Sequence, residues 1–480
     1  PPPPPPSSLH PALMLGRRTH GATQQCDLPL VGRVPRAAVV VALVALAVVL
    51  AGANWALSRE AGHLLHMAEL EASIEAYRTR SATLEAKLDS ELAVLAALDL
   101  RVTALAKAAP SVAASRPAPP GRGASAGGGT TIPLVVMACD RTEYLKRTLD
   151  KVVDIVPPSD TNDAVIFPLF VSQDCRDSPR ASAVEDLVAS YGRFTLLTND
   201  NPDRPRSKPG ENIKYYFIAQ HFQFALTQLF DVYGYTQVVL IEEDLEVAPD
   251  FFEYMAAALP VLRADPSLYC VSAYNDNGKP NVVADPRAVE RTDMFPGLGW
   301  MLTRELWAEL GRANWAKGYW DDWLREPAQR KKRSCIRPQV SRTKTFGEKG
   351  TSVGQFYSNH LAHIKLNDKP VDWRAEDLSY LLKDEYDGAL DAKLAAATPL
   401  SLPDFKALDA KAGADGRLPG TAYKLTYPAA ESSYRPIAAH FGITDDWKAS
   451  VPRTAYHGVV SLAYKGAAVY LVPERPTYDF

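Results

Sequence analysis

Three adjacent acidic residues, Glu242, Glu243 and Asp244, directly follow the apolar residues 238–241 in the segment YTQVVLIEEDLEVAPDFFEY. Adjacent carboxylates raise each other's pKa unless a cation or hydrogen-bond donors offset the charge. Hard divalent ions such as Mg²⁺ and Mn²⁺ prefer oxygen ligands, and proteins often hold them with one or two carboxylates while substrate phosphates complete the shell. The run therefore indicates a metal and phosphate site; stabilisation of a helix that starts at Pro249 is the alternative.

A second pair of adjacent carboxylates, Asp321 and Asp322, lies in the segment YWDDWLR. Either could act as a general base, which must accept a proton from the group that it activates. Adjacent residues on a helix do not share a face, so we expect only one of them to point into a cleft. Helix capping or pairing with Arg325 is the structural alternative.

The elements that must position these side chains alternate between residues 132 and 244. Short apolar segments read as strands, and the segments between them have helical spacing. This alternation predicts an α/β domain with a mostly parallel sheet and helices on both faces. The predicted strands cover residues 132–141, 165–175, 193–200 and 235–244, and the predicted helices cover residues 142–156, 182–192 and 212–234.

Three of the predicted strands end in polar residues. Asp140 and Arg141 end the first, Gln173 and Asp174 end the second, and the acidic run ends the fourth. Ligands of open α/β sheets bind outside the carboxyl ends of the strands. The acidic run therefore lies where this architecture builds its site.

Composition and motifs exclude several classes of protein. The 480 residues are 46% hydrophobic, which is enough for a large core. The net charge of −3 argues against a nucleic-acid partner, because the chain has no basic field. The sequence has no P-loop motif and no GxGxxG after the first strand, which argues against P-loop and dinucleotide enzymes. The GxSxG match at residues 350–354 follows a polar stretch and is interpreted as chance.

The N-terminal part of the sequence predicts a membrane anchor. Residues 1–36 begin with PPPPPPSS and have the composition of a disordered tail. Residues 37–57 contain no charge and are long enough for a spanning helix. Arg17, Arg18, Arg33 and Arg36 precede this segment and favour a cytoplasmic N-terminus. A cleaved signal peptide and a buried soluble helix are the alternatives.

A stalk and two further units are expected after the anchor. Residues 58–107 have apolar heptad spacing, which predicts a helical stem that forms a homodimeric coiled coil; a single amphipathic helix is the alternative. Residues 108–131 form a Pro-, Gly- and Ser-rich linker. The main α/β domain should cover residues 132–370, and a smaller C-terminal unit with a β-hairpin at residues 457–473 should cover residues 371–480.

The cysteines fit this topology. Cys139, Cys175, Cys270 and Cys335 lie beyond the predicted anchor, in a compartment that permits disulfides. Four cysteines allow three pairings. Cys26 would lie on the cytoplasmic side, as a free or lipidated thiol.

Five strings, in a fixed order, resemble glycosyltransferase family 13, the N-acetylglucosaminyltransferase I family of the Golgi: EEDLEVAPDFFEY, PSLYCVSAYNDNG, FPGLGWML, YWDDWLR and SRTKTFGEKG. The resemblance extends from about residue 132 to the C-terminus. It implies a GT-A fold, UDP-GlcNAc as donor and Mn²⁺ as cofactor. It also implies inverting transfer of GlcNAc to the 2-hydroxyl of the α1,3-linked mannose of a high-mannose Man5 N-glycan, by a single-pass type II protein of the Golgi membrane whose catalytic domain faces the lumen.

The resemblance also implies roles for individual residues. Asp244 would bind Mn²⁺, and Asp321 would be the general base. The pairs Cys139 with Cys175 and Cys270 with Cys335 would be the disulfides. Positions that match donor contacts of the family are Arg141, Asp174, His221, Glu242, Glu243 and Ser352.

Several interpretations stay open beside these roles. Trp320 and Trp323 could stack on sugar or belong to the core. His221 lies in an apolar helix, where a buried, satisfied imidazole is the default. Residues 345–356 contain Gly347, Gly350 and Gly354 and could form a mobile lid or a plain surface loop.

Glu243 is one departure from the family, which has Asp at the middle of the acidic triad. A related branch that modifies O-linked mannose tolerates Glu there, so transfer of GlcNAc to O-linked mannose is the alternative activity. A membrane-tethered lectin that has lost catalysis is the alternative outside enzymes.

Overall fold

The computed structural model describes residue 75 and residues 130–158, 165–175, 177–200, 205–311, 314–348, 350–351, 354, 357–413 and 416–479. The predicted tail, anchor and stem and most of the predicted linker lie outside the described residues. The exceptions are Glu75, which is helical and exposed, and Thr130 and Thr131 at the end of the linker. No helix in the described part combines the length and the apolar character needed to span a membrane. Residues 118–480 form one compact unit, separate from residues 1–117.

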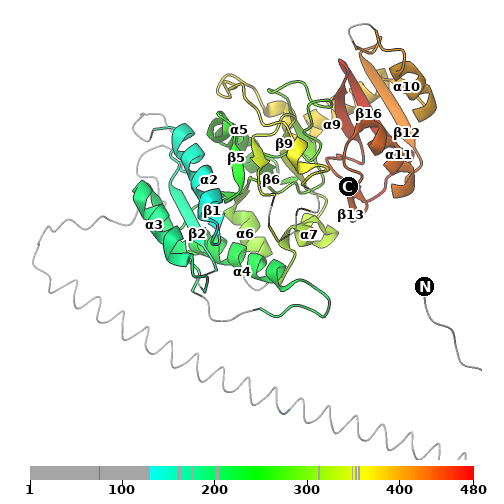
Figure 1. Cartoon of the computed structure of the whole chain (residues 1–480). Coiled ribbons are helices and arrows are strands. Elements are labelled where there is room, and N and C mark those ends of the chain that lie inside the picture. The colour runs from blue at the N-terminus through cyan, green and yellow to red at the C-terminus, as the bar shows by residue number, and fades with distance from the viewer. Residues whose placement is uncertain are drawn as a thin grey trace, which may run out of the picture. The chain divides into compact units, whose positions relative to one another are not determined.

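An eight-stranded sheet occupies the centre of this unit, with the strand order β3-β2-β1-β4-β8-β6-β9-β7 (Figure 1). The strands are β1 (Leu134–Ala138), β2 (Leu169–Gln173), β3 (Phe194–Thr198), β4 (Gln237–Glu242), β6 (Leu268–Ser272), β7 (Val289–Thr292), β8 (Trp300–Thr303) and β9 (Ser334–Pro338).

The first half of the sheet has the predicted arrangement. Strands β3, β2, β1 and β4 are all parallel to their neighbours. The second half is mixed, because β8 runs antiparallel to both β4 and β6 and β7 runs antiparallel to β9, whereas β6 and β9 are parallel. The prediction of a mostly parallel sheet therefore holds only for the first half. Strands β6, β7 and β8 follow one another without a helix between them, so the alternation that marks the first half is missing here.

Alternate side chains of β1 enter two different cores, as the two-residue period of a strand requires. Leu134 and Val136 pack in a core with α2 (Thr142–Ile155), α3 (Ala181–Tyr191) and α5 (Phe251–Ala264). Val135 and Met137 pack on the opposite face. The helices of that face are α4 (Ile213–Thr227), its π-helical extension η1 (Gln228–Val232), α6 (Arg304–Leu310) and α7 (Trp320–Arg325). Helices thus cover both faces, as predicted.

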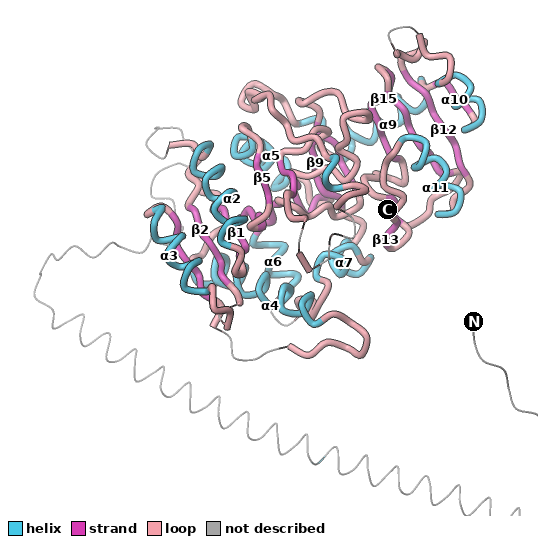
Figure 2. Tube along the Cα trace, in the orientation of Figure 1, coloured by secondary structure: helices cyan, strands magenta, loops and turns pink. Residues whose placement is uncertain are grey.

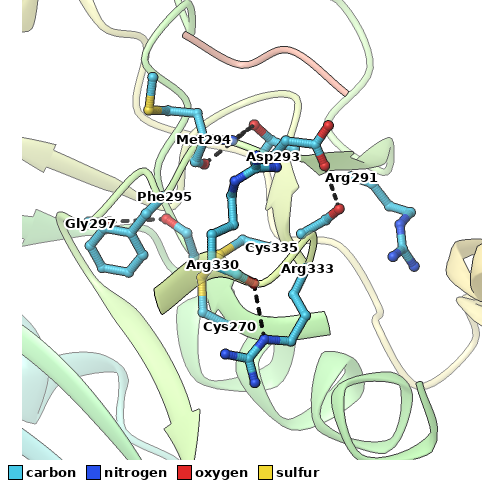
Figure 3. Close-up of a disulfide and its surroundings, with 12 residues drawn as sticks. Cys270, Arg291, Asp293, Met294, Phe295, Gly297, Arg330, Arg333 and Cys335 are labelled. Carbon is cyan, nitrogen blue, oxygen red and sulfur yellow. Dashed lines mark hydrogen bonds between the residues drawn. A yellow bond between two sulfur atoms is a disulfide. The ribbon is translucent and has the colours of Figure 1, made fainter. Parts of the chain in front are cut away.

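Both disulfides implied by the family resemblance are present. Cys139 bonds to Cys175 with 5.1 Å between the Cα atoms, and this bond joins the segments that follow β1 and β2. Cys270 bonds to Cys335 between the parallel neighbours β6 and β9 (Figure 3). Beside the second bond, the Ser334 hydroxyl donates to Asp293 Oδ1 at 2.6 Å.

A second sheet with the order β11-β12-β16-β15 lies near the C-terminus (Figure 2). The predicted hairpin is confirmed as β15 (Val460–Tyr464) and β16 (Ala467–Pro473). This sheet has a core of its own, to which the body adds Val282 and Met294. The other elements there are α9 (Lys383–Ala396), β11 (Thr398–Leu400), α10 (Leu402–Asp409), β12 (Ala422–Tyr427), α11 (Glu431–Phe441), β13 (Trp447–Lys448) and β14 (Val451–Pro452).

Candidate functional site

The acidic run lies at the carboxyl end of β4, beside the ends of β1 and β2. β1 pairs with β4 and with β2, so the residues after these three strands share one edge of the sheet (Figure 1). Cys139 N–H donates to Glu243 Oε2 at 3.0 Å, which shows how closely the ends of β1 and β4 approach. The parallel half of the sheet therefore gathers these polar groups, as predicted.

A tight turn holds Glu243 and Asp244 between two strands. The turn joins β4 to β5 (Leu245–Val247), which pairs antiparallel with β10 (Thr343–Thr345). The buried Thr148 hydroxyl of α2 contacts the Glu243 carbonyl at 2.8 Å and the Leu245 carbonyl at 3.0 Å. The helix that follows begins only at Phe251. The helix-stabilising interpretation of the acidic run is therefore wrong, because β5 separates the run from the helix.

Arg141 is the positive group that three adjacent carboxylates require. Its Nε donates to Glu243 Oε1 at 2.7 Å, and its Nη2 donates to Asp244 Oδ2 at 3.0 Å. Burial lowers the pKa of Arg141, but the two carboxylates outweigh burial, so the pKa lies above its ordinary value. One guanidinium thus bridges two of the three acids.

Three carboxyl groups lie at this edge, and Arg141 pairs with only two of them among the described residues. Burial first, and then the charges of Asp244, Asp321 and Glu243, raise the pKa of Glu242 to about 8, against the opposing effect of Arg141. Burial also raises the pKa of Glu243, and Arg141 acts against this shift. An additional cation at this edge would be stabilised by these carboxylates.

Asp174 and His221 form a second, more buried part of the site. The Asp174 N–H donates to the Ala138 carbonyl at 3.0 Å. The His221 Nε2 lies 2.9 Å from the Ser172 hydroxyl, on the strand that ends beside Asp174. Burial lowers the pKa of His221 to about 4, although Asp174 acts to raise it. His221 is therefore a neutral imidazole that shares a hydrogen bond with Ser172, and the charge of Asp174 acts on it.

Asp321 and Asp322 both lie in the first turn of α7, which follows Tyr319 at a left-handed φ of 50°. Arg325 Nη1 lies 2.8 Å from Asp321 Oδ2 and 2.8 Å from Asp322 Oδ1. Both carboxylates therefore pair with Arg325, as the structural alternative predicted. The second oxygen of Asp322 lies 3.1 Å from Lys448 Nζ.

Asp321 is the carboxylate of this pair that acts on the acidic run. Its charge raises the pKa of Glu242 and also the pKa of Arg453, although burial is the larger influence on both groups. The Asp321 side chain is 43% exposed. Asp321 therefore combines access to solvent with proximity to the β4 end.

The two tryptophans of the YWDDWLR segment differ. Trp320 is buried and stacks on Phe222 with 4.2 Å between ring centroids, and it also stacks on Trp300. Trp320 is therefore a core residue rather than a sugar-binding wall. Trp323 is partly buried and meets Trp315 edge to face.

The segment predicted to be a lid begins against the acidic turn. The Phe346 N–H donates to the Asp244 carbonyl at 2.9 Å. A Cβ placed on Gly347 would lie 2.1 Å from Asp244 Oδ2, so only glycine permits this approach. Ser352 lies outside the described residues, and so do residues 349, 353, 355 and 356.

Asp244 fits a hard divalent cation as a single protein ligand. Its carboxylate is 17% exposed at the sheet edge, and Arg141 Nη2 contacts one of its oxygens. In the described part of the chain no three His, Cys, Asp or Glu side chains are grouped as a complete metal site. A single carboxylate oxygen donor suits an ion whose remaining ligands come from phosphate and water.

The comparisons with known proteins agree with this arrangement. The family model described as "GNT-I family" matches residues 36–480. This chain belongs to the GNT-I family. An Arabidopsis thaliana protein named "Alpha-1,3-mannosyl-glycoprotein 2-beta-N-acetylglucosaminyltransferase" is 42% identical to this GNT-I family member over 328 residues, which are 68% of this chain and 70% of the relative.

Solved structures resemble this GNT-I family member only remotely. GalNAc-T7 with UDP, GalNAc and Mn²⁺ covers 45% of this chain and 44% of its own, with 11% identity and a TM-score of 0.31. A Drosophila β-1,4-galactosyltransferase 7 mutant with manganese, UDP-Gal and xylobiose covers 52% and 82%, with 15% identity and a TM-score of 0.25. Both scores are too low to add to the argument.

Two residues of the site, Lys448 and Thr148, were not predicted from the sequence. Lys448 lies more than a hundred residues after Asp322, and no motif links the two. Thr148 carries a weak signal, a hydroxyl on the apolar face of a predicted helix. Both follow from tertiary contacts.

Proposed function

We propose that this chain is a GT-A glycosyltransferase that moves GlcNAc from UDP-GlcNAc to the 2-hydroxyl of the α1,3-linked mannose of a Man5 N-glycan. The observation that supports this most strongly is the 42% identity to the Arabidopsis enzyme named for that transfer. The mixed sheet with helices on both faces is compatible with a GT-A domain. Acceptors would be glycoproteins that carry high-mannose N-glycans.

The donor side of the proposed reaction would use the edge of the parallel strands. Arg141 and the carboxylates of Glu242 and Glu243 offer donors and acceptors for the nucleotide and the sugar. Asp174 lies beside them at the end of β2. His221 supports this edge through Ser172, and its neutral ring would not repel a cation there.

A divalent ion, Mn²⁺ in this proposal, would be held by Asp244 together with the donor diphosphate. Bound there, it would act as a Lewis acid that stabilises the charge of the departing UDP. Asp244 Oδ2 is paired with Arg141, so the carboxylate must share its oxygens between the guanidinium and the ion. In this proposal the Arg141 guanidinium, which adjoins Asp244, lies next to the diphosphate.

The acceptor side would use Asp321 as the general base. In a single inverting displacement, the acceptor hydroxyl attacks the anomeric carbon, and its proton passes to a carboxylate. Asp321 is exposed enough to meet an acceptor, and its charge affects Glu242 at the donor edge. Arg325 orients Asp321 at 2.8 Å.

The cellular placement is part of the same proposal. Residues 37–57 would anchor the chain as a single-pass type II protein in the Golgi membrane, with the described unit in the lumen. The stem at residues 58–107 would form a homodimeric coiled coil. The apolar character of the first segment and the heptads of the second support this placement.

The proposed function can be tested by transfer assays with the purified full-length chain, UDP-GlcNAc and Mn²⁺. One arm offers a Man5 N-glycan, and the other offers an O-mannosyl peptide. Transfer to the N-glycan is the expected result. Transfer to the peptide alone would overturn the acceptor, and the absence of transfer in both arms would overturn the proposed activity.

A further inference from the structure

A contact from the C-terminal unit reaches the helix that bears the proposed base. Lys448 of β13 lies 3.1 Å from Asp322 Oδ2, and the two residues are 126 positions apart in the sequence. We propose that Lys448 is a positioning residue for the transfer reaction, which acts on Asp321 through Asp322 and Arg325. This inference rests on the proposed function and assigns a role to the C-terminal unit.

The β13–β14 hairpin presents Lys448 in a defined position. Lys448 pairs with Val451 in the ladder, so only Ala449 and Ser450 form the turn. Both turn residues have a positive φ, 47° and 64°, as a two-residue hairpin turn requires. Neither is glycine, and a left-handed conformation is unfavourable for a residue that has a Cβ. The surrounding structure must therefore hold this turn in place.

Contacts on both sides fix the hairpin. On the side of the C-terminal unit, Trp447 packs on Tyr434 of α11 with 5.7 Å between ring centroids. On the side of the body, Arg453 Nη1 lies 3.1 Å from Asp276 Oδ1, and its Nε lies 2.7 Å from Asp446 Oδ2. The β13 label lies next to α7 in the view of Figure 2, in agreement with the contact between Lys448 and Asp322.

The charges explain why Lys448 matters for Asp321. One Arg325 nitrogen, Nη1, serves both Asp321 and Asp322 at 2.8 Å. Two carboxylates that share one cation compete for it, and their mutual repulsion favours a movement of one of them. Lys448 draws the other oxygen of Asp322 towards the hairpin. It thereby leaves Arg325 to hold Asp321 in one orientation.

Loss of the pair between Lys448 and Asp322 should lower the rate of transfer rather than the stability of the fold. Lys448 and Asp322 are 41% and 38% exposed, and an exposed ion pair contributes little to the stability of the fold. A small displacement of a catalytic group, by contrast, can cost a large factor in rate. Lys448 therefore contributes to the reaction by helping to position Asp321, and not by stabilising the fold.

The test is a mutant cycle in the full-length chain, with GlcNAc transfer to the Man5 N-glycan as the assay. Lys448→Met should lower kcat about five- to tenfold, with the KM for UDP-GlcNAc and the unfolding free energy nearly unchanged. Lys448→Arg should restore most of the rate. In an Asp322→Asn background, Lys448→Met should lower kcat no further, because the ion pair between Lys448 and Asp322 is already lost.

A matched control uses another lysine of the same unit. Lys465 pairs with Asp409 at 2.7 Å and has no contact with α7, so Lys465→Met should leave kcat unchanged. Equal kcat for Lys448→Met and wild type would overturn this inference alone, as would a full effect of Lys448→Met in the Asp322→Asn background. Absence of transfer by the wild-type chain would instead overturn the proposed function on which the inference rests.

Discussion

Two clusters in the main domain pair an arginine with carboxylates, and they differ in how fully the carboxylates are satisfied. Arg342 and Asp250 are both completely buried, 3.0 Å apart. The Asp250 oxygens also accept hydrogen bonds from Trp373 Nε1 at 2.9 Å and from Asn367 Nδ2 at 3.0 Å. At the sheet edge, the ion pairs of Arg141 are partly exposed, and one guanidinium serves two carboxylates.

The difference separates a structural cluster from a functional one. A buried carboxylate with donors on both oxygens has no capacity left for a ligand, and it stabilises the fold only because its partner is present. The edge cluster has more carboxylates than cations, with the pKa of Glu242 raised to about 8 by burial first and by neighbouring charge second. Such a surplus marks the place where a cation and a substrate can bind.

The largest expected effect concerns the proposed base. Asp321→Asn keeps the shape of the side chain and removes the proton acceptor, so kcat should fall by about 10²–10⁴-fold. Binding of UDP, measured by calorimetry with Mn²⁺, should change little, because the donor edge is intact. A variant with wild-type turnover would remove Asp321 from the mechanism.

Asp250→Asn should mainly affect stability. It leaves the fully buried Arg342 without a carboxylate, which should lower the unfolding free energy by about 3–5 kcal/mol. Urea denaturation measures this loss. Asp244→Asn is the matched variant at the sheet edge: it should lower kcat, though by less than Asp321→Asn does, and it should cost less stability than Asp250→Asn because Asp244 is 17% exposed whereas Asp250 is fully buried. Similar losses of stability in both variants would remove the distinction between the two clusters.

His221 should contribute a pH dependence that belongs to the fold. Its pKa in the folded chain is about 4, below the ordinary value of 6.5, because burial disfavours the charged ring. The unfolded chain therefore binds the proton first, and the stabilising contribution, complete above pH 6.5, is lost as the pH falls towards 4. At pH 5 the loss should be about 2 kcal/mol.

Denaturation of wild type and of His221→Gln at pH 7.5 and pH 5 isolates this contribution. Glutamine does not titrate, so the wild type should lose about 2 kcal/mol more than the variant between the two pH values. Equal losses would show that His221 is not the titrating group.

The smallest expected effect concerns the approach of the loop to the acidic turn. Gly347→Ala places a Cβ against Asp244 Oδ2 and should reduce kcat/KM about tenfold by displacing either group. Gly350→Ala is the control, because nothing described lies within 4 Å of a Cβ there. Equal kinetics for the two variants would mean that the contact at Gly347 has no role in transfer.

Local patterns were sufficient for the parallel half of the main domain. The apolar runs and helical spacing between residues 132 and 244 predicted β1 to β4 and the helices between them, because strands and helices alternate there and β1, β2 and β4 are almost entirely buried. The same reasoning placed Arg141 and the acidic run at one edge. The mixed half was not predicted, because β6, β7 and β8 follow one another without helices and its strands pair with partners distant in sequence.

The candidate site likewise has features that were predicted before the structure and features that only the structure revealed. The Cys139–Cys175 pairing came from family resemblance, as did the choice of Asp321 over Asp322, and the structure confirms the first of these. The contact between Lys448 and Asp322 could not be predicted from the sequence, because no motif contains both residues. The burial of Trp320 was left open for a similar reason, because its partners Phe222 and Trp300 come from separate elements.

By itself, the sequence determined the alternation of strands and helices and the position of the acidic run at a strand end, because both depend on periodicities within a few neighbouring residues. Only the tertiary structure decided which carboxylates have hydrogen-bond donors on both oxygens and which share a single arginine. Those answers depend on side chains that the fold brings together from distant segments, as Arg141 does for Asp244 and Lys448 does for Asp322.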